Sequence, residues 1–167
     1  KIEMFAQTTN KNKLANKNGI HWISLEEAQE KMKSEPKKVY IDLYTDWCGW
    51  CKVMDKKTFS HKQVIDFMNT HFYCVRLHAE TKDSILFKSK MYGRMEDEKT
   101  NQLAVEWMNY TISYPNSIFF DEHFENRQTI PGYLDIKDME MISRYIGENK
   151  HKSIPFETYK KSFKPSW

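Results

Sequence analysis

Two cysteines stand two residues apart in the segment Cys48-Gly49-Trp50-Cys51, and this spacing is the feature of the sequence most able to do chemistry. Two sulfur atoms so placed at the start of a helix can close a short disulfide ring. The free backbone amides and the helix dipole favour a thiolate on the first sulfur, and the thiolate is the species that attacks a disulfide. We therefore expect Cys48 to be the nucleophile and a more shielded Cys51 to resolve the mixed disulfide.

The same pair could instead form half of a zinc site, which needs two more ligands at a similar spacing. His61, His71 and His78 are available, but none belongs to a second paired motif. A Cys-X-X-Cys segment within a strand–helix–strand pattern is typical of redox proteins. The redox interpretation is therefore favoured, with no metal and no prosthetic group expected. The third cysteine, Cys74, lies in an apolar strand pattern and is expected to be a buried small residue.

The composition is typical of a soluble globular protein. The chain has 167 residues, of which 40% are hydrophobic and 14% aromatic, enough for one domain with a real core. Its longest apolar runs are only a few residues, far short of the roughly 20 that cross a membrane, so no membrane span is expected. The 26 basic and 23 acidic residues nearly balance, which does not indicate a nucleic-acid surface.

The elements around the cysteines follow from hydrophobic spacing and capping residues. A capping box at Ser24 predicts a helix up to Pro36, and a β-branched and aromatic run predicts a buried strand over 39–44 that contains one acid, Asp42. The cysteine helix comes next, followed by a helix from a second capping box at Ser60 and a strand over 72–77. From about 80 to 99 the pattern becomes polar and suggests an inserted hairpin.

The second half of the chain predicts three helices and two strands. They are a helix around 103–108, antiparallel strands over 117–120 and up to 130, a helix from Asp135 to Gly147, and a short helix over 156–163. Strands that first alternate with helices and then form a hairpin predict an α/β fold with a mixed central sheet flanked by helices.

The segment from Asp42 to Lys52 resembles the active-site segment of the thioredoxin superfamily. That family carries an acid six residues before the first cysteine, then Trp-Cys-Gly-x-Cys-Lys, and Asp42 and Trp47 occupy the matching positions. Tyr114-Pro115 before an apolar strand looks like the family's cis-proline loop, and Gly132 matches its glycine before the last core helix. The segment from Thr58 to Asn69, which begins Thr-Phe-Ser-His-Lys-Gln-Val, is similar to that of bacterial envelope thioredoxin-like proteins, such as the C-terminal domain of the DsbD thiol reductant transporter.

The resemblance implies roles for residues around the cysteines. Asp42 would be a buried acid with a raised pKa that takes the proton of Cys51; the alternative is a surface-facing strand residue. Substrate contacts would come from residues that flank the reactive sulfur or form the cis-proline loop. They are Trp47, Gly49, Trp50, Tyr114 and Pro115. Of these, Trp50 replaces the proline of ordinary thioredoxins, and we expect its side chain to be exposed.

The resemblance also implies a function and an organisation. A thiol–disulfide oxidoreductase that reduces protein disulfides, supplied by an upstream thiol donor, is the first expectation. The alternatives are a disulfide isomerase or oxidase, or a non-cycling binding or chaperone-like module. Residues 1–18 would be a flexible leader, 19–148 a thioredoxin-like domain with its insertion, and 149–167 a helical extension. We expect a monomer in a bacterial periplasm or envelope, with the cytoplasm as the alternative.

Overall fold

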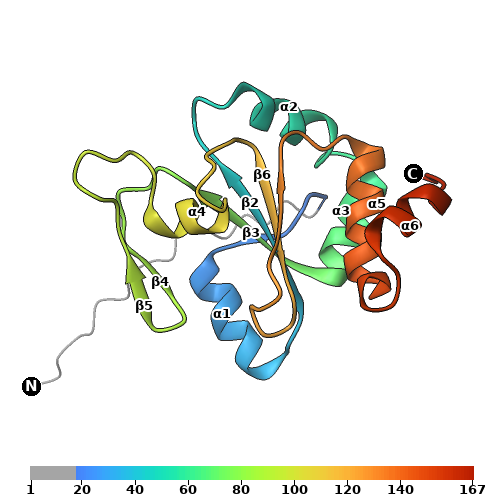
Figure 1. The fold of residues 1–167 in the computed structure, drawn as a ribbon, viewed down its shortest axis with the longest axis horizontal. Coiled ribbons are helices and arrows are strands. Elements are labelled where there is room, and N and C mark those ends of the chain that lie inside the picture. The colour runs from blue at the N-terminus through green and yellow to red at the C-terminus, as the bar shows by residue number, and fades with distance from the viewer. Residues whose placement is uncertain (1–17) are drawn as a thin grey trace, which may run out of the picture.

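The computed structural model describes residues 18–167, so the predicted leader lies outside the described residues except for its last position. Five strands form one sheet in the order β1-β3-β2-β6-β7, and β4 and β5 form a separate hairpin (Figure 1). β1, β3 and β2 are parallel to one another, β6 is antiparallel to β2, and β7 is antiparallel to β6. This mixed sheet with helices around it confirms the predicted fold class.

The strands are β1 (Trp22–Ile23), β2 (Lys38–Tyr44), β3 (Phe72–His78), β4 (Ile85–Phe87), β5 (Lys90–Tyr92), β6 (Asn116–Phe120) and β7 (Gln128–Pro131). The helices are α1 (Leu25–Ser34), α2 (Gly49–Lys57), α3 (Lys62–His71), α4 (Gln102–Trp107), α5 (Ile136–Gly147) and α6 (Phe156–Ser162), with a 3₁₀ turn at Lys150–Lys152. No helix within residues 18–167 is both long enough and apolar enough to cross a membrane.

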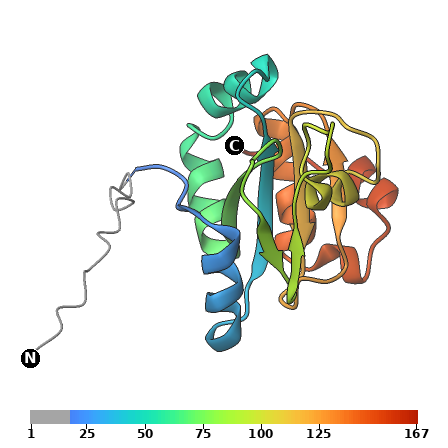
Figure 2. The same ribbon diagram turned by 90° about the vertical axis from the view of Figure 1, so that its left-hand side faces the viewer.

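The helices cover the sheet on both faces, and each face has its own apolar cluster. α1, α4 and the β4–β5 hairpin lie on one face, and α2, α3 and α5 lie on the other (Figures 1 and 2). Side chains alternate across β2: Val39 and Ile41 join the first cluster and Tyr40 joins the second. The same alternation turns Asp42 toward the face that α2 covers, which is the face of the cysteines.

One helix start differs from the sequence prediction. Ser24 caps α1 by accepting the Glu27 N–H, as predicted, but Ser60 does not cap α3. Its hydroxyl donates to the Lys56 carbonyl four residues back, so it closes the last turn of α2, and α3 begins one residue later at Lys62. The helix predicted from Asp135 to Gly147 is confirmed, with Asp135 as its N-cap and Gly147 as its last residue.

The inserted segment and the first strand are the fold's additions to the central βαβ unit. β4 and β5 pair antiparallel, which confirms the hairpin predicted within residues 80–99; Lys90, expected in the turn, is the first residue of β5. Gln29 of α1 donates to the Leu86 carbonyl and accepts the Lys88 N–H, so the hairpin is tied to the first helix. β1 was not predicted, because two residues are too few to show any periodicity.

Candidate active site

The disulfide lies at the start of α2, where the polypeptide leaves β2. Cys48 is the N-cap of α2, and its Sγ accepts the backbone N–H of Cys51 at 3.1 Å. The two cysteines are joined as a disulfide with Cα atoms 5.3 Å apart. The predicted helix start is confirmed, and with it the placement of Cys48 at the positive end of the helix dipole.

Burial of the two cysteines differs from the prediction that Cys48 would be the more exposed. Cys48 is 4% exposed and Cys51 is 5% exposed, so in the oxidised form both are covered to the same extent.

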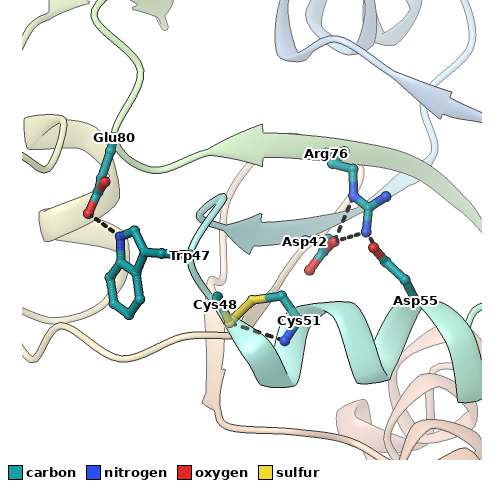
Figure 3. The surroundings of a disulfide bond; sticks show 7 residues. All are labelled: Asp42, Trp47, Cys48, Cys51, Asp55, Arg76 and Glu80. Atoms are coloured by element: carbon teal, nitrogen blue, oxygen red, sulfur yellow. Dashed lines mark hydrogen bonds and ion pairs between the residues drawn. A yellow bond between two sulfur atoms is a disulfide. The ribbon is translucent and has the colours of Figure 1, made fainter.

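Two exposed tryptophans flank the disulfide. Trp47 is 66% exposed; its indole N–H donates to Glu80 at 2.9 Å and its ring meets the Tyr114 ring edge-on at 5.7 Å (Figure 3). Trp50 is 60% exposed, as predicted, and packs against the Tyr133 ring at 5.2 Å. Large aromatic side chains in solvent on both sides of a buried disulfide form a surface that an apolar peptide can cover.

The loop before β6 lies beside the cysteine loop. The Tyr114–Pro115 peptide bond is cis, and the contact between Tyr114 and Trp47 brings the two loops together. The Pro115 carbonyl accepts the N–H of Gly132, whose φ of +96° suits glycine. Gly49 faces open space, since a Cβ there would meet no atom within 4 Å.

Asp42 is buried beneath the helix that carries the cysteines. It is 2% exposed, and its Oδ2 accepts from Nε and Nη2 of Arg76, each at 3.0 Å (Figure 3). The same Nη2 is hydrogen-bonded to Asp55 of α2. The alternative of a surface-facing strand residue is therefore wrong, and Asp42 is a buried acid with a cationic partner.

Burial of Asp42 raises its pKa from 3.8 to about 6, although the nearby Arg76 guanidinium lowers it; the Asp55 carboxylate raises it further. Near neutral pH the side chain is therefore a carboxylate that can take up a proton at little cost. A group with these properties behind a thiol can act as its general base. Cys74, by contrast, is buried and its thiol has a pKa raised to about 12, which makes it unreactive.

Three charged residues at the site were missed by the sequence analysis. Arg76 is the one charge in the strand predicted over 72–77, and pairing of that strand with β2 in parallel register places it opposite Asp42. Asp55 follows Cys51 by four residues and so lies on the same side of the helix. Nothing in the sequence pattern indicated a role for Glu80, because its contact with Trp47 depends on the path of a loop. Within residues 18–167 no three His, Cys, Asp or Glu side chains cluster as a metal site.

The fold and the disulfide at the start of α2 define a thioredoxin-fold protein with a Cys-X-X-Cys pair. The chain belongs to the family Thioredox_DsbH, described as "Protein of unknown function, DUF255", whose profile matches residues 5–143. The resemblance to the thioredoxin superfamily is thereby confirmed.

Relatives and solved structures agree with this family. The thiol:disulfide interchange protein DsbD of Haemophilus ducreyi is 48% identical over 114 residues, which cover 66% of this chain and 17% of that protein. DsbD of Pseudoalteromonas atlantica is 35% identical over 69 residues, covering 39% and 12%. This chain spans less than a fifth of the curated relatives it matches. A thioredoxin-fold protein from Helicobacter pylori shares the fold with a TM-score of 0.57 at 16% identity, covering 75% of this chain and 79% of that one.

Proposed function

We propose that the protein is a thiol–disulfide oxidoreductase whose Cys48–Cys51 pair cycles between disulfide and dithiol, and that the reduced form reduces disulfides of protein substrates. The observation that carries this proposal is a disulfide at the N-cap of α2 with a buried carboxylate behind it. Relatives named thiol:disulfide interchange proteins support it.

The cycle has two exchange steps. The Cys48 thiolate attacks a substrate disulfide, so that a Cys48–substrate bond forms and one substrate sulfur leaves as a thiolate. Cys51 then gives its proton to Asp42 and attacks the Cys48 sulfur. The second substrate sulfur leaves and is protonated. Two electrons have passed to the substrate, and an upstream thiol donor reduces the pair again.

The rim of the site contacts the substrate in this proposal. Trp47, Gly49 and Trp50 surround the reactive sulfur on the helix side, and the backbone of Tyr114 beside Pro115 pairs with an extended substrate segment as a short added strand. The exposed aromatic rings favour a peptide over a small thiol, because they offer apolar area beyond the sulfur itself. We place the monomeric protein in a bacterial periplasm or envelope, which fractionation of cells that express the full-length gene tests.

Replacement of Cys51 by serine tests the roles of the two cysteines. The Cys51→Ser protein is expected to accumulate a mixed disulfide on Cys48 when it meets an oxidised protein such as insulin, because the resolving thiol is absent. Mass mapping of the trapped species checks this. Cys48→Ser should trap far less, and the matched control Cys74→Ser should cycle like the wild type, since Cys74 is buried. Equal trapping by Cys48→Ser would contradict the assignment.

The reduction potential of the Cys48–Cys51 pair tests the direction of electron flow. Reduction potentials span about −270 mV for thioredoxin to about −120 mV for a strong oxidant such as DsbA. A reductase is expected near the thioredoxin end when the Cys48–Cys51 pair is equilibrated with glutathione. A value near the oxidising end would favour the oxidase or isomerase alternative. A pair that stays unreactive toward both thiols and disulfides would favour a binding module.

A further inference from the structure

The inserted segment and the cysteine loop enclose a hollow beside the redox site. Its volume is about 530 Å³, within the roughly 300–1,000 Å³ that is usual for ligand sites. We call it the insertion cleft, and its charged and titratable lining residues are Asp46, His78, Glu80, Lys82, Arg94 and Lys99. The far wall is fixed to the end of β3, because the Asn101 N–H donates to the Ala79 carbonyl at 2.8 Å and Arg94 pairs with Asn101.

The insertion cleft begins at the rim of the redox site. Asp46 is the residue before Trp47, and Glu80 accepts the Trp47 indole N–H at 2.9 Å (Figure 3). Trp47 in turn contacts the Tyr114 ring of the cis-proline loop. A polypeptide that lies over Trp47 with its disulfide at Cys48 therefore has the insertion cleft next to it.

The two carboxylates at this end of the cleft already have hydrogen-bond donors. His78 Nδ1 accepts the Glu80 N–H at 3.0 Å, so the imidazole proton is on Nε2, which lies 3.0 Å from Asp46 Oδ2. Both donors, the imidazole of His78 and the indole of Trp47, are neutral, so Asp46 and Glu80 keep their negative charge. An anionic group is therefore disfavoured directly beside Trp47 and has to lie further out, toward the inserted segment.

The cations of the cleft, by contrast, have no anionic partner. Lys82, Arg94 and Lys99 are exposed, and within residues 18–167 none of them forms an ion pair. Arg94 donates only to the Lys99 carbonyl, at 3.5 Å. The acidic run 96–98 lines a neighbouring hollow with the same three cations and does not pair with them either. Three cations around one hollow repel one another and attract a carboxylate, which the fork of Arg94 can bind through two nitrogens.

We propose that the insertion cleft binds an acidic side chain of the protein substrate, so that the reductase prefers disulfides flanked by Asp or Glu. The inference rests on the proposed function and gives its substrate class. The substrate carboxylate accepts hydrogen bonds from Lys82, Arg94 and Lys99 in place of water, while apolar substrate residues cover Trp47. The cleft takes no part in the exchange of sulfur bonds; it only holds the segment that carries the disulfide.

The size of the preference follows from the exposure of the cations. An exposed ion pair changes affinity only a few-fold, so three cations acting on a pair of substrate carboxylates should give about a 5- to 10-fold preference in kcat/KM. Charges at the rim of an interface act mainly on the rate of association and are sensitive to salt. The preference should therefore disappear when salt is raised from about 0.1 M to about 1 M, where the screening length falls from about 10 Å to about 3 Å.

Two peptides with blocked ends and one internal disulfide test the proposal. They differ only in the residues that flank the disulfide, which are Glu in one and Gln in the other, and mass spectrometry follows their reduction by the reduced protein. Each ratio of rates is divided by the ratio obtained with dithiothreitol, which corrects for the effect of Glu on the disulfide itself. The wild type should prefer the Glu peptide about 5- to 10-fold. The triple variant Lys82→Gln, Arg94→Gln, Lys99→Gln should show a ratio close to one.

Two further triple variants control for net charge. Lys160→Gln, Lys161→Gln, Lys164→Gln removes the same charge from α6 and should keep the wild-type preference. Lys52→Gln, Lys56→Gln, Lys57→Gln removes it from the helix that carries the cysteines and should keep most of it. A loss in either control equal to the loss in the cleft variant would overturn the assignment to the cleft.

Binding without turnover gives a second readout. A cysteine-free peptide with the same Glu residues, added to the oxidised protein, should shift the backbone amide NMR signals of Lys82, Arg94 and Lys99, and the Gln peptide should not. Absence of these shifts, or equal reduction of both disulfide peptides by the wild type, would overturn the inference and leave the proposed function standing. A wild-type protein that reduces neither peptide would overturn both.

Discussion

Asp42 is kept ionised in surroundings that disfavour ionisation, since burial raises its pKa to about 6 and the Arg76 guanidinium opposes that rise. A carboxyl group buried for structural reasons alone would be expected to have a pKa lowered by its partner. This intermediate pKa suits the proposed cycle, because a base must both receive the Cys51 proton and release it. Burying the ionised Asp42 also lowers the folding stability, which can be measured.

Asp42→Asn is expected to stabilise the oxidised protein near neutral pH by about 2 kcal/mol. The rise of the Asp42 pKa from 3.8 to about 6 lowers the free energy of unfolding by at most about 3 kcal/mol, and the variant removes most of this penalty. The folded pKa of about 6 lies above the usual 3.8, so the folded state binds the extra proton and wild-type stability falls as pH rises through this window. The difference between the two proteins should vanish below the usual carboxyl pKa. Urea unfolding at several pH values checks this.

Asp55→Asn is the matched control for the stability measurement. Asp55 is more exposed than Asp42, and exposed ion pairs contribute little, about 0–1 kcal/mol. We therefore expect little change in this variant at any pH. A loss of stability in Asp42→Asn near neutral pH would mean that the ion pair with Arg76 is worth more than the desolvation it requires.

At this scale the sequence predicts the residues whose position along the chain determines their surroundings. Cys48 and Asp42 are of this kind, since one begins a helix and the other interrupts an apolar strand. Arg76 and Glu80 act through contacts between segments more than thirty residues apart in sequence. Such contacts follow from strand register and loop path, which side-chain periodicity does not determine.

Among the elements, the additions to the central fold supply contacts to the active site. β1 has two residues, yet it brings Trp22 onto Arg76. The segment leading into the inserted hairpin brings Glu80 to Trp47. The long helices were predictable from periodicity and the hairpin from a break in the periodic pattern. β1 was not predictable, because it is formed by pairing with β3 and not by local preference.

Gly147 shows how helix packing can require a glycine. It is the last residue of α5 and is itself helical. A Cβ at this position would lie 3.0 and 3.2 Å from ring carbons of Phe67 and 3.3 Å from Phe72. Glycine is required here because α5 passes close to the aromatic side chains of α3 and of the start of β3.

Gly147→Ala is therefore expected to destabilise the protein by about 1–2 kcal/mol, although alanine is the better helix former by about 1 kcal/mol. The reason is that the half-buried Phe67 ring, stacked on His71 at 3.9 Å, has little room to move. Thermal unfolding checks the direction. Gly49→Ala is the control, since its Cβ meets nothing within 4 Å, and it should lose no stability. Stabilisation by Gly147→Ala would show that the Phe67 ring can move aside to make room for the new methyl group.

Across the whole molecule a second buried carboxylate lies on the same face of the sheet as the redox site, but on a different helix. Glu140 of α5 is 1% exposed and accepts the backbone N–H and hydroxyl of Ser166 and the N–H of Trp167, at 2.7 to 3.3 Å. The Trp167 ring packs on Phe67 at 5.4 Å and under the Arg144 guanidinium. The segment after α6 is thus fastened across α3 and α5.

Glu140 and Asp42 should respond to pH in opposite ways. Burial tends to raise the Glu140 pKa, but the hydrogen bonds from Ser166 and Trp167 and the charge of Arg144 outweigh it, so the pKa lies below the usual 4.5. A depressed folded pKa means that Glu140 stabilises the fold at neutral pH and that this contribution is lost as pH falls through the folded pKa. Glu140→Gln is expected to cost about 1.5–3 kcal/mol near neutral pH, the usual worth of hydrogen bonds to a charged group. The cost should shrink in acid.

Urea unfolding of Glu140→Gln, with limited proteolysis at residues 160–167, tests this fastening. Glu148→Gln serves as the control, because Glu148 pairs with the same Arg144 at the more exposed end of the helix and should change stability by less than about 1 kcal/mol. Earlier cleavage of the segment in Glu140→Gln and unchanged cleavage in Glu148→Gln are expected. The rate of the resolving step at Cys51 should depend on pH in both variants as it does in the wild type, since neither residue contacts Asp42, Arg76 or the disulfide. Equal stability of Glu140→Gln and the wild type near neutral pH would mean that packing of Trp167 alone fastens the segment.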